Sequence, residues 1–245
     1  MTIRLFEVGG SIRDELMGID NPSDRDFCAE SPDGWEALLA WCHDNMEKVF
    51  LVTPEFFTVR GFIKEQALAI DVVMCRKDGP SSDGRHPDHV EPGTLLEDLA
   101  RRDFTINAMA REVDPKTLKP IGDIIDPFDG KSDLMTHTLR CVGNTKERLH
   151  EDGLRILRAA RFLVTKNLGP SVDLAAELSS PLPWLWMDET VSTERVREEL
   201  QKMFKHDGAD AIRFLATDCA HTALTVLVGQ TSDIWLKPTM EKRKR

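Results

Sequence analysis

The chain has 245 residues and a formal net charge of −10 at neutral pH, with 41% hydrophobic and 30% charged residues. This length allows one large domain or two modest ones, and the apolar fraction excludes a disordered chain. No run approaches the ~18 consecutive apolar residues that span a bilayer, and the first residues lack the apolar core of a secretory signal. The acidic balance excludes a protein that coats nucleic acid nonspecifically, but it allows a local basic face.

The cysteines and the charges are distributed unevenly along the chain. Five cysteines lie far apart and none forms a C-x-x-C pair, so we expect neither a zinc knuckle nor a disulfide framework. This pattern favours a reducing, cytoplasmic compartment. Between His137 and Leu168 seven cations accompany only three anions, which makes this stretch the candidate basic face.

The first half mixes short apolar runs with turn signals, as in an α+β domain. The first strand is predicted at residues 5–8, and a second one ends at residues 26–28. Three more strands are predicted at 48–53, 57–63 and 68–75. Helices are predicted at 11–17, 35–46 and 95–110, followed by a turn at 122–130. The polar, Gly- and Pro-rich stretch 76–92 is predicted to be a long loop.

From about residue 144 the pattern is almost wholly helical. Helices are predicted at residues 146–166, 172–178, 192–206 and 209–227. We therefore predict two domains, an α+β domain at 1–136 and a helical domain at 137–245 that ends in a short tail.

Two acids, Asp24 and Asp26, flank Arg25. On a strand, residues two apart project from the same face, so the two carboxylates would lie side by side. Their oxygens suit Mg²⁺, which takes one or two carboxylates together with substrate phosphates. A pair of solvated loop acids is the alternative. Asp71 lies in an apolar run where an unpaired carboxylate is costly to bury, so we expect it to have a partner.

Gly9 and Gly10 follow the first predicted strand and open a short helix. Glycine lets a phosphate approach the backbone, and a helix N-terminus presents free N–H groups. Arg13, one turn further on, can bind a triphosphate. The pattern is neither the dinucleotide fingerprint nor a P-loop, and a plain tight turn is the alternative. A phosphate-binding turn before a carboxylate pair favours nucleotidyl transfer.

With these residues the sequence resembles the class II tRNA nucleotidyltransferases and bacterial poly(A) polymerases, of the polymerase-beta-like nucleotidyltransferase superfamily. The first matching segment runs from Gly9 to Gly18 and continues with Asp24–Arg25–Asp26. Further segments match in order at residues 98–110, 125–130 and 151–162, and more weakly at 192–200. The resemblance extends over about residues 5 to 204.

The resemblance implies a palm-like nucleotidyltransferase sheet with flanking helices, the head, followed by an all-helical neck. It implies that Asp24 and Asp26 hold two Mg²⁺ ions. A third carboxylate, Asp71, would act as general base or ligand, with a structural hydrogen bond as the alternative. Gly10, Arg13 and Arg102 would bind the phosphates of the nucleotide.

The resemblance assigns nucleotide recognition to residues 151–162. Asp152 and Arg155 are three apart, which places them on one helical face, where they would hydrogen-bond the base of CTP and then of ATP. Arg158 and Arg161 continue the same ridge and would also bind nucleotide. An ordinary salt bridge within the helix is the alternative. For two more residues a structural role and a role in the site stay equally open; these are Asp103 and Asn107.

The implied reaction is template-independent addition of CCA to the tRNA 3′ end, with CTP and ATP as substrates and a two-metal mechanism. A poly(A) polymerase is the nearest alternative, but its usual basic stretch is absent at residues 49–57. An enzyme that adds only CC or only A, and a non-catalytic RNA-binding module, are further alternatives. Relatives commonly carry proline where Gly153 stands. Relatives also continue into further helical domains that hold the tRNA, so we expect that either the basic face, or a partner or self-association, holds the tRNA here.

Overall fold

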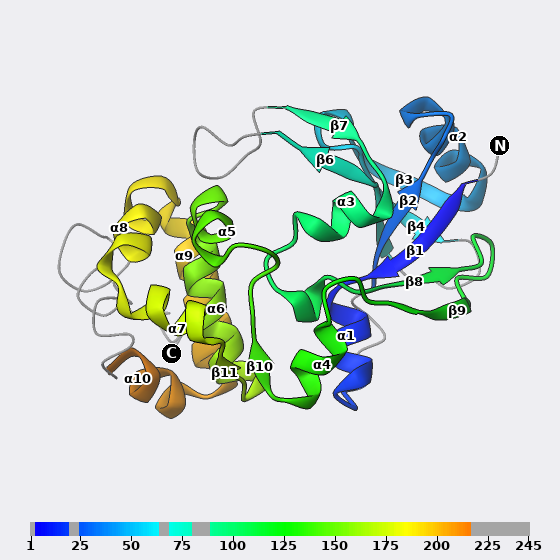
Figure 1. Cartoon of the computed structure of the whole chain (residues 1–245). Coiled ribbons are helices and arrows are strands. Elements are labelled where there is room, and N and C mark those ends of the chain that lie inside the picture. Colours follow the sequence, from blue (N-terminus) through cyan, green and yellow to red (C-terminus); the bar gives the residue numbers. More distant parts are fainter. Residues whose placement is uncertain (1–2, 20–24, 64–68, 80–88, 217–245) are drawn as a thin grey trace, which may run out of the picture.

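The computed structural model describes residues 3–19, 25–63, 69–79 and 89–216. A seven-stranded sheet occupies one half of the molecule and a group of helices the other (Figure 1). The strand order is β3-β4-β5-β2-β1-β8-β9. The strands are β1 (Arg4–Val8), β2 (Asp26–Glu30), β3 (Met46–Thr53), β4 (Thr58–Ile63), β5 (Ala69–Met74), β8 (Ala110–Val113) and β9 (Pro120–Ile125).

Side chains that alternate along these strands build two separate cores. One face packs Leu5, Phe27 and Val72 against helix α2 (Trp35–Asn45). The other face packs Phe6 and Cys28 against helix α3 (Leu95–Ala100). The strands β2 and β5 run parallel, whereas β1 is antiparallel to both β2 and β8.

Short elements connect the strands. They are α1 (Gly10–Leu16), η1 (Pro54–Phe56), η2 (Thr105–Asn107), α4 (Gly130–Met135), the hairpin β6 (Arg76–Asp78) and β7 (Val90–Pro92), and the parallel pair β10 (Thr138–Leu139) and β11 (Gly169–Pro170). The four cysteines in the described ranges are buried free thiols.

The helical half comprises α5 (Thr145–Glu151), α6 (Leu154–Lys166), α7 (Val172–Ser179), α8 (Pro181–Thr190), α9 (Thr193–His206) and α10 (Gly208–Ala216). Its core gathers Leu157 of α6, Trp184 of α8 and Met203 of α9. Phe104 and Ile106, which come from the sheet-bearing half, belong to the same core, so the two halves share buried apolar surface. In the residues that the structure describes, no helix is both long and apolar enough to span a membrane.

The predicted α+β class is confirmed, and several element boundaries are corrected. The strand with Asp26 begins at this residue rather than ending near it. The predicted helix 95–110 ends at Ala100, because the following apolar residues separate into the two cores, Phe104 in the helical half and Ala110 under α3. The turn predicted at 122–130 begins as strand β9, and the helix α8 was not predicted.

The predicted long loop 76–92 begins with β6 and ends with β7. Its middle, residues 80–88, lies outside the described residues, as does the predicted helical continuation and tail after residue 216.

Candidate active site

A pocket of about 580 Å³ lies where the sheet meets helix α6. Among its lining residues are eight for which the sequence predicts a role in the site: Gly10, Arg13, Asp26, Arg102, Asp152, Arg155, Arg158 and Arg161. It is also lined by Gly9, Arg101, Asp103, Asn107, Phe162 and Lys202. The lining thus holds seven cationic side chains and three acidic ones, so the pocket suits a strongly anionic ligand such as a triphosphate.

Two carboxylates stand side by side at the edge of this pocket. Asp26 is directly opposite Asp71 on the parallel strand β5, which places both side chains on the same face of the sheet. Asp71 has the partner that the sequence requires, since Arg60 of β4 forms a bidentate ion pair with it. Asp71 does not line the pocket itself, and Asp24 lies outside the described residues.

The donor set of this edge fits a magnesium ion. The carboxylates of Asp26 and Asp71 offer hard oxygen ligands next to a pocket for phosphates, which is the mixed ligand set that Mg²⁺ prefers. Within the described ranges, there is no group of three or more His, Cys, Asp or Glu side chains that could hold a metal ion.

Gly9 brings the backbone close to Arg102. Its φ of +76° lies in the left-handed region that favours glycine. A Cβ on Gly9 would lie 2.9 Å from Nη1 of Arg102, so a side chain here would displace the guanidinium. Arg102 Nη2 is held by the carboxylate of Asp98 at 3.1 Å. Burial would raise the pKa of Asp98, but the charges of Arg101 and Arg102 outweigh it and lower this pKa.

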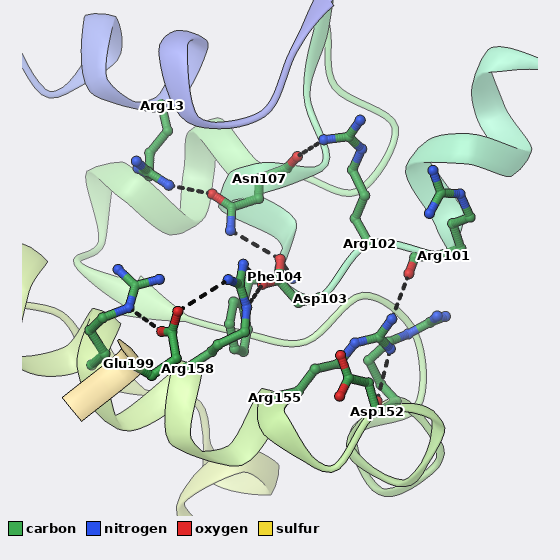
Figure 2. Close-up of polar contacts among 12 residues, drawn as sticks. Arg13, Arg101, Arg102, Asp103, Phe104, Asn107, Asp152, Arg155, Arg158 and Glu199 are labelled. Atoms are coloured by element: carbon green, nitrogen blue, oxygen red, sulfur yellow. Dashed lines mark hydrogen bonds and ion pairs between the residues drawn. The ribbon is translucent and has the colours of Figure 1, made fainter. Parts of the chain in front are cut away.

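Asp103 connects the two halves of the site, as Figure 2 shows. Its buried carboxylate accepts hydrogen bonds from Nε of Arg158 at 2.9 Å and from Nδ2 of Asn107 at 3.0 Å. Asn107 in turn accepts from Arg13 (Figure 2). Burial alone would raise the pKa of Asp103, but the charge of Arg158 and these hydrogen bonds outweigh it and hold the pKa well below its ordinary value. Asp103 and Asn107 therefore fix the positions of two arginines in the pocket.

The ring of Phe162 lies among three guanidinium groups. The Cζ atoms of Arg161, Arg13 and Arg158 are 4.2, 5.1 and 5.7 Å from the ring centroid. Cation–π attraction contributes to gathering these like charges in one place. The sequence did not single out Phe162, although it follows Arg158 by one helical turn within the matched segment 151–162.

A second buried acid, Glu199 of α9, also neutralises part of this cluster. Its carboxylate accepts from Nε of Arg161 and from Nζ of Lys202, the latter at 2.9 Å. Burial would raise the pKa of Glu199, and the charge of Arg161 lowers it below its ordinary value. The sequence contained a signal for this residue, because Glu199 lies in the weakly matching segment 192–200.

The prediction that Asp152 and Arg155 share one helical face is wrong. Asp152 ends α5 in an extended conformation, with φ −142°, and α6 begins only at Leu154. The Asp152 carboxylate accepts from Nη2 of Arg195 on α9 at 3.0 Å, whereas Arg155 donates to the Arg101 carbonyl at 3.0 Å. Both side chains nevertheless line the pocket.

The matched segment 125–130 packs against the turn that carries Asn107. The Asp126 carboxylate accepts from the backbone N–H groups of Gly130 and Lys131, at 2.7 and 2.9 Å, and so caps α4. A Cβ on Gly130 would lie only 2.4 Å from the Thr105 carbonyl oxygen. Glycine therefore lets α4 pack closely on η2, the turn that carries Asn107.

Comparison with known proteins places the chain in a family. The family model named "Poly A polymerase head domain" matches residues 5–140, which is more than half of the chain. The chain belongs to this family. Membership confirms the resemblance found in the ordered motifs.

Relatives of the family resemble the chain beyond the head. The CCA-adding enzyme of Lacticaseibacillus paracasei is 34% identical over 201 residues, which are 81% of this chain and 45% of that enzyme. The one of Lactobacillus johnsonii is 41% identical over 136 residues, 54% of this chain and 31% of that enzyme. The chain spans about half or less of the length of these curated relatives.

Solved structures agree. The Bacillus stearothermophilus CCA-adding enzyme in complex with CTP matches with a TM-score of 0.70 and 29% identity, over 87% of this chain and 48% of that one. The Thermotoga maritima CCA-adding enzyme complexed with tRNA matches with a TM-score of 0.71 and 27% identity, over 94% of this chain and 49% of that one.

Proposed function

We propose that the chain is a template-independent nucleotidyltransferase that adds CMP and AMP, from CTP and ATP, to the 3′ end of tRNA. The observation on which this proposal rests is the pocket, in which Gly9, Gly10 and a cluster of arginines lie next to the carboxylate of Asp26. The names of the relatives, CCA-adding enzymes, and the CTP and tRNA complexes of two similar structures support the same activity.

Magnesium is the proposed cofactor. Asp26 and Asp71 would hold it, together with Asp24, which stands two residues before Asp26 in the sequence. Held by these carboxylates, the ion would supply a lower pKa for the attacking 3′-hydroxyl and neutralisation of charge on the triphosphate.

Different residues of the chain bind different parts of the nucleotide. The backbone at Gly10 and the side chains of Arg13 and Arg102 bind the phosphates, where charge-assisted hydrogen bonds are strong. Asp152 supplies acceptors and Arg155 supplies donors for the edge of the base. We place the domain boundary near residue 136, with the head before it and the neck after it.

The deciding experiment is incubation with a tRNA transcript that lacks CCA, with Mg²⁺ and each labelled NTP in turn. The expected product is two C residues followed by a single A. A run of A would instead identify a poly(A) polymerase, and CC or A alone would identify a partial enzyme. Binding of the transcript without any incorporation would overturn the proposal.

Asp26→Asn provides the matched test of the site. Incorporation is expected to fall by a factor of ~100 or more, because a ligand of the metal is lost, while the thermal unfolding midpoint stays close to that of the wild type. The control is Asp123→Asn, which removes an exposed acid on the far edge strand β9 and is expected to leave incorporation unchanged.

A further inference from the structure

The edge of the sheet formed by β3 and β4 carries exposed aromatic rings. Phe50 and Phe62 are 44% and 37% exposed, and their ring centroids are 5.2 Å apart. Phe50 is the extra residue at a register shift between Val49 and Leu51, and such a bulge re-aims a side chain. Exposed rings that gather in this way mark a candidate binding surface.

The aromatic pair lies on the same face of the sheet as the carboxylates. Arg60 of β4 is directly opposite Asp71, and Phe62 follows Arg60 by two residues, or ~7 Å along the strand. Lys48 of β3 is directly opposite Phe62 and is exposed. The alternate residue of β4, Val59, is buried against α2 on the other face.

The strand order puts the carboxylates between the pocket and the aromatic pair. Gly9 follows β1, Asp26 begins β2 and Asp71 lies on β5, while Phe62 and Phe50 come from the next two strands. The pocket with its arginines is therefore on the β1 side of Asp26, and the exposed rings are on the β5 side.

Phosphoryl transfer requires this kind of two-sided arrangement. The attacking and leaving oxygens are roughly in line, so the acceptor hydroxyl must approach from the side opposite the pyrophosphate. With the triphosphate in the arginine-lined pocket, the acceptor has to lie over β5, β4 and β3. The surface it would meet there carries Arg60, Phe62, Phe50 and Lys48.

We propose that these four residues form a seat for the single-stranded 3′-terminal nucleotides of the acceptor RNA, an inference that rests on the proposed function. Bases stack on Phe50 and Phe62, as they do on the aromatic platforms of single-strand-binding proteins. Lys48 and Arg60 attract the phosphates between those bases. Because every base has a stacking face, such a seat tolerates a terminus that changes as nucleotides are added.

The test measures RNA binding without nucleotides, by fluorescence anisotropy of a labelled tRNA transcript that ends in CC. The variant Phe50→Ala/Phe62→Ala is expected to bind it about 10-fold more weakly than the wild type, from the stacking lost per base. The KM for ATP, the nucleotide that is added next to this transcript, is expected to stay within about twofold, since the pocket is intact. The matched control is Ile121→Ala/Ile125→Ala, which removes two apolar side chains of similar exposure, 60% and 38%, from the opposite edge strand.

Phe50→Leu/Phe62→Leu serves if the alanine variant unfolds, because leucine keeps the apolar volume but cannot stack a base. A 4-thiouridine at the 3′ terminus of the transcript is expected to crosslink to Phe50 or Phe62 upon irradiation.

Equal RNA binding by the wild type and both variants would overturn the seat while leaving the proposed function standing. Wild-type protein that neither binds nor extends the transcript would overturn the proposed function itself. A wild-type dimer that the alanine variant converts to monomers would show a self-association surface and also overturn the seat.

Discussion

The buried carboxylate of Asp103 and the half-buried guanidinium of Arg158 form an ion pair between the sheet-bearing half of the molecule and helix α6. Nε of Arg158 is 2.9 Å from Oδ2 of Asp103, and the Asp103 side chain is 9% exposed. Since Asn107 and, through it, Arg13 contact the same carboxylate, one acid orders both the Arg13 side and the Arg158 side of the pocket.

Asp103→Asn is expected to lower the free energy of unfolding by about 1–3 kcal/mol, because it removes the nearer of the two carboxylates that neutralise the half-buried guanidinium of Arg158 and leaves only Glu199, at 3.9 Å. Urea denaturation followed by circular dichroism measures this change. The control is Glu112→Gln, which breaks an ion pair with the exposed side chain of Arg4 and is expected to cost less than about 1 kcal/mol. Similar losses in the two variants would contradict the importance of burial.

The same pair predicts a pH dependence of stability. The pKa of Asp103 is lower in the folded protein than in the unfolded chain, where it is about 3.9. The stability that this shift supplies is therefore fully present above pH ~4 and is lost as the pH falls from there toward the folded-state pKa. The difference in unfolding free energy between wild type and Asp103→Asn should thus be equal at pH 7 and pH 5 and smaller at pH 3. A difference that already shrinks between pH 7 and pH 5 would refute this assignment.

Base selection is expected to depend on Arg195, which the sequence did not single out. Arg195 of α9 is the cation that holds Asp152, whereas Arg155 is held elsewhere. Arg195→Ala frees the Asp152 carboxylate to rotate, so discrimination between CTP and UTP, measured as the ratio of kcat/KM values, should fall about 10-fold. Arg213→Ala, which removes an exposed arginine paired with Asp210 on α10, should leave the ratio unchanged.

The sequence predicted this site through residues whose type and spacing have a local meaning. Gly9 and Gly10 after a strand, and arginines at three-residue intervals, indicate a phosphate turn and a cationic ridge without any knowledge of the fold. The residues that the sequence missed act through contacts that the fold creates. Lys202 reaches the pocket, and Glu199 reaches Arg161, only because α9 packs along α6.

The errors in the elements have the same origin. A continuous helical pattern at residues 146–166 does not reveal the break at Asp152, because the pattern of apolar residues continues through it. Tertiary contacts impose the break: Arg195 binds Asp152 from α9, and α8 packs against Gly153. Similarly, the period of residues 95–110 is helical, but Phe104 is drawn into a different core from Leu99.

The turn at Gly9 and Gly10, which is the proposed phosphate-binding turn, is expected to require a glycine at position 9 for two reasons. One is the backbone conformation, and the other is that a side chain would collide with Arg102. Gly9 and Gly34 both precede helices with positive φ, +76° and +85°, but a Cβ meets Arg102 only at Gly9, and nothing within 4 Å at Gly34. Each substitution by alanine carries a backbone strain of about 1–3 kcal/mol, because both glycines combine positive φ with strongly negative ψ. Only Gly9→Ala should also raise the KM for ATP, by about 10-fold, in steady-state incorporation assays. Equal KM values in the two variants would indicate that Arg102 moves aside without consequence.

Gly153 is expected to be needed for packing between α8 and the start of α6. Its φ of −55° suits any residue, so its backbone gives no reason for glycine. A Cβ, however, would lie 2.7 Å from Oγ1 of Thr190 and 3.1 Å from the backbone Cα of Met187. Gly153→Ala should therefore lower the free energy of unfolding by about 1–3 kcal/mol in urea denaturation, despite the better helix propensity of alanine.

Thr190→Ala separates the two contacts of Gly153. It removes the hydroxyl that the new methyl group would meet but leaves the backbone of Met187 in place. The double variant should therefore recover part of the stability lost in Gly153→Ala, a non-additivity that a double-mutant cycle measures. Gly122→Ala, at a glycine whose Cβ position has no neighbour within 4 Å, is the control and should stay within about 0.5 kcal/mol of the wild type. Full stability of Gly153→Ala would instead show that α8 can move away from α6 at no cost, and that the glycine does not determine this interface.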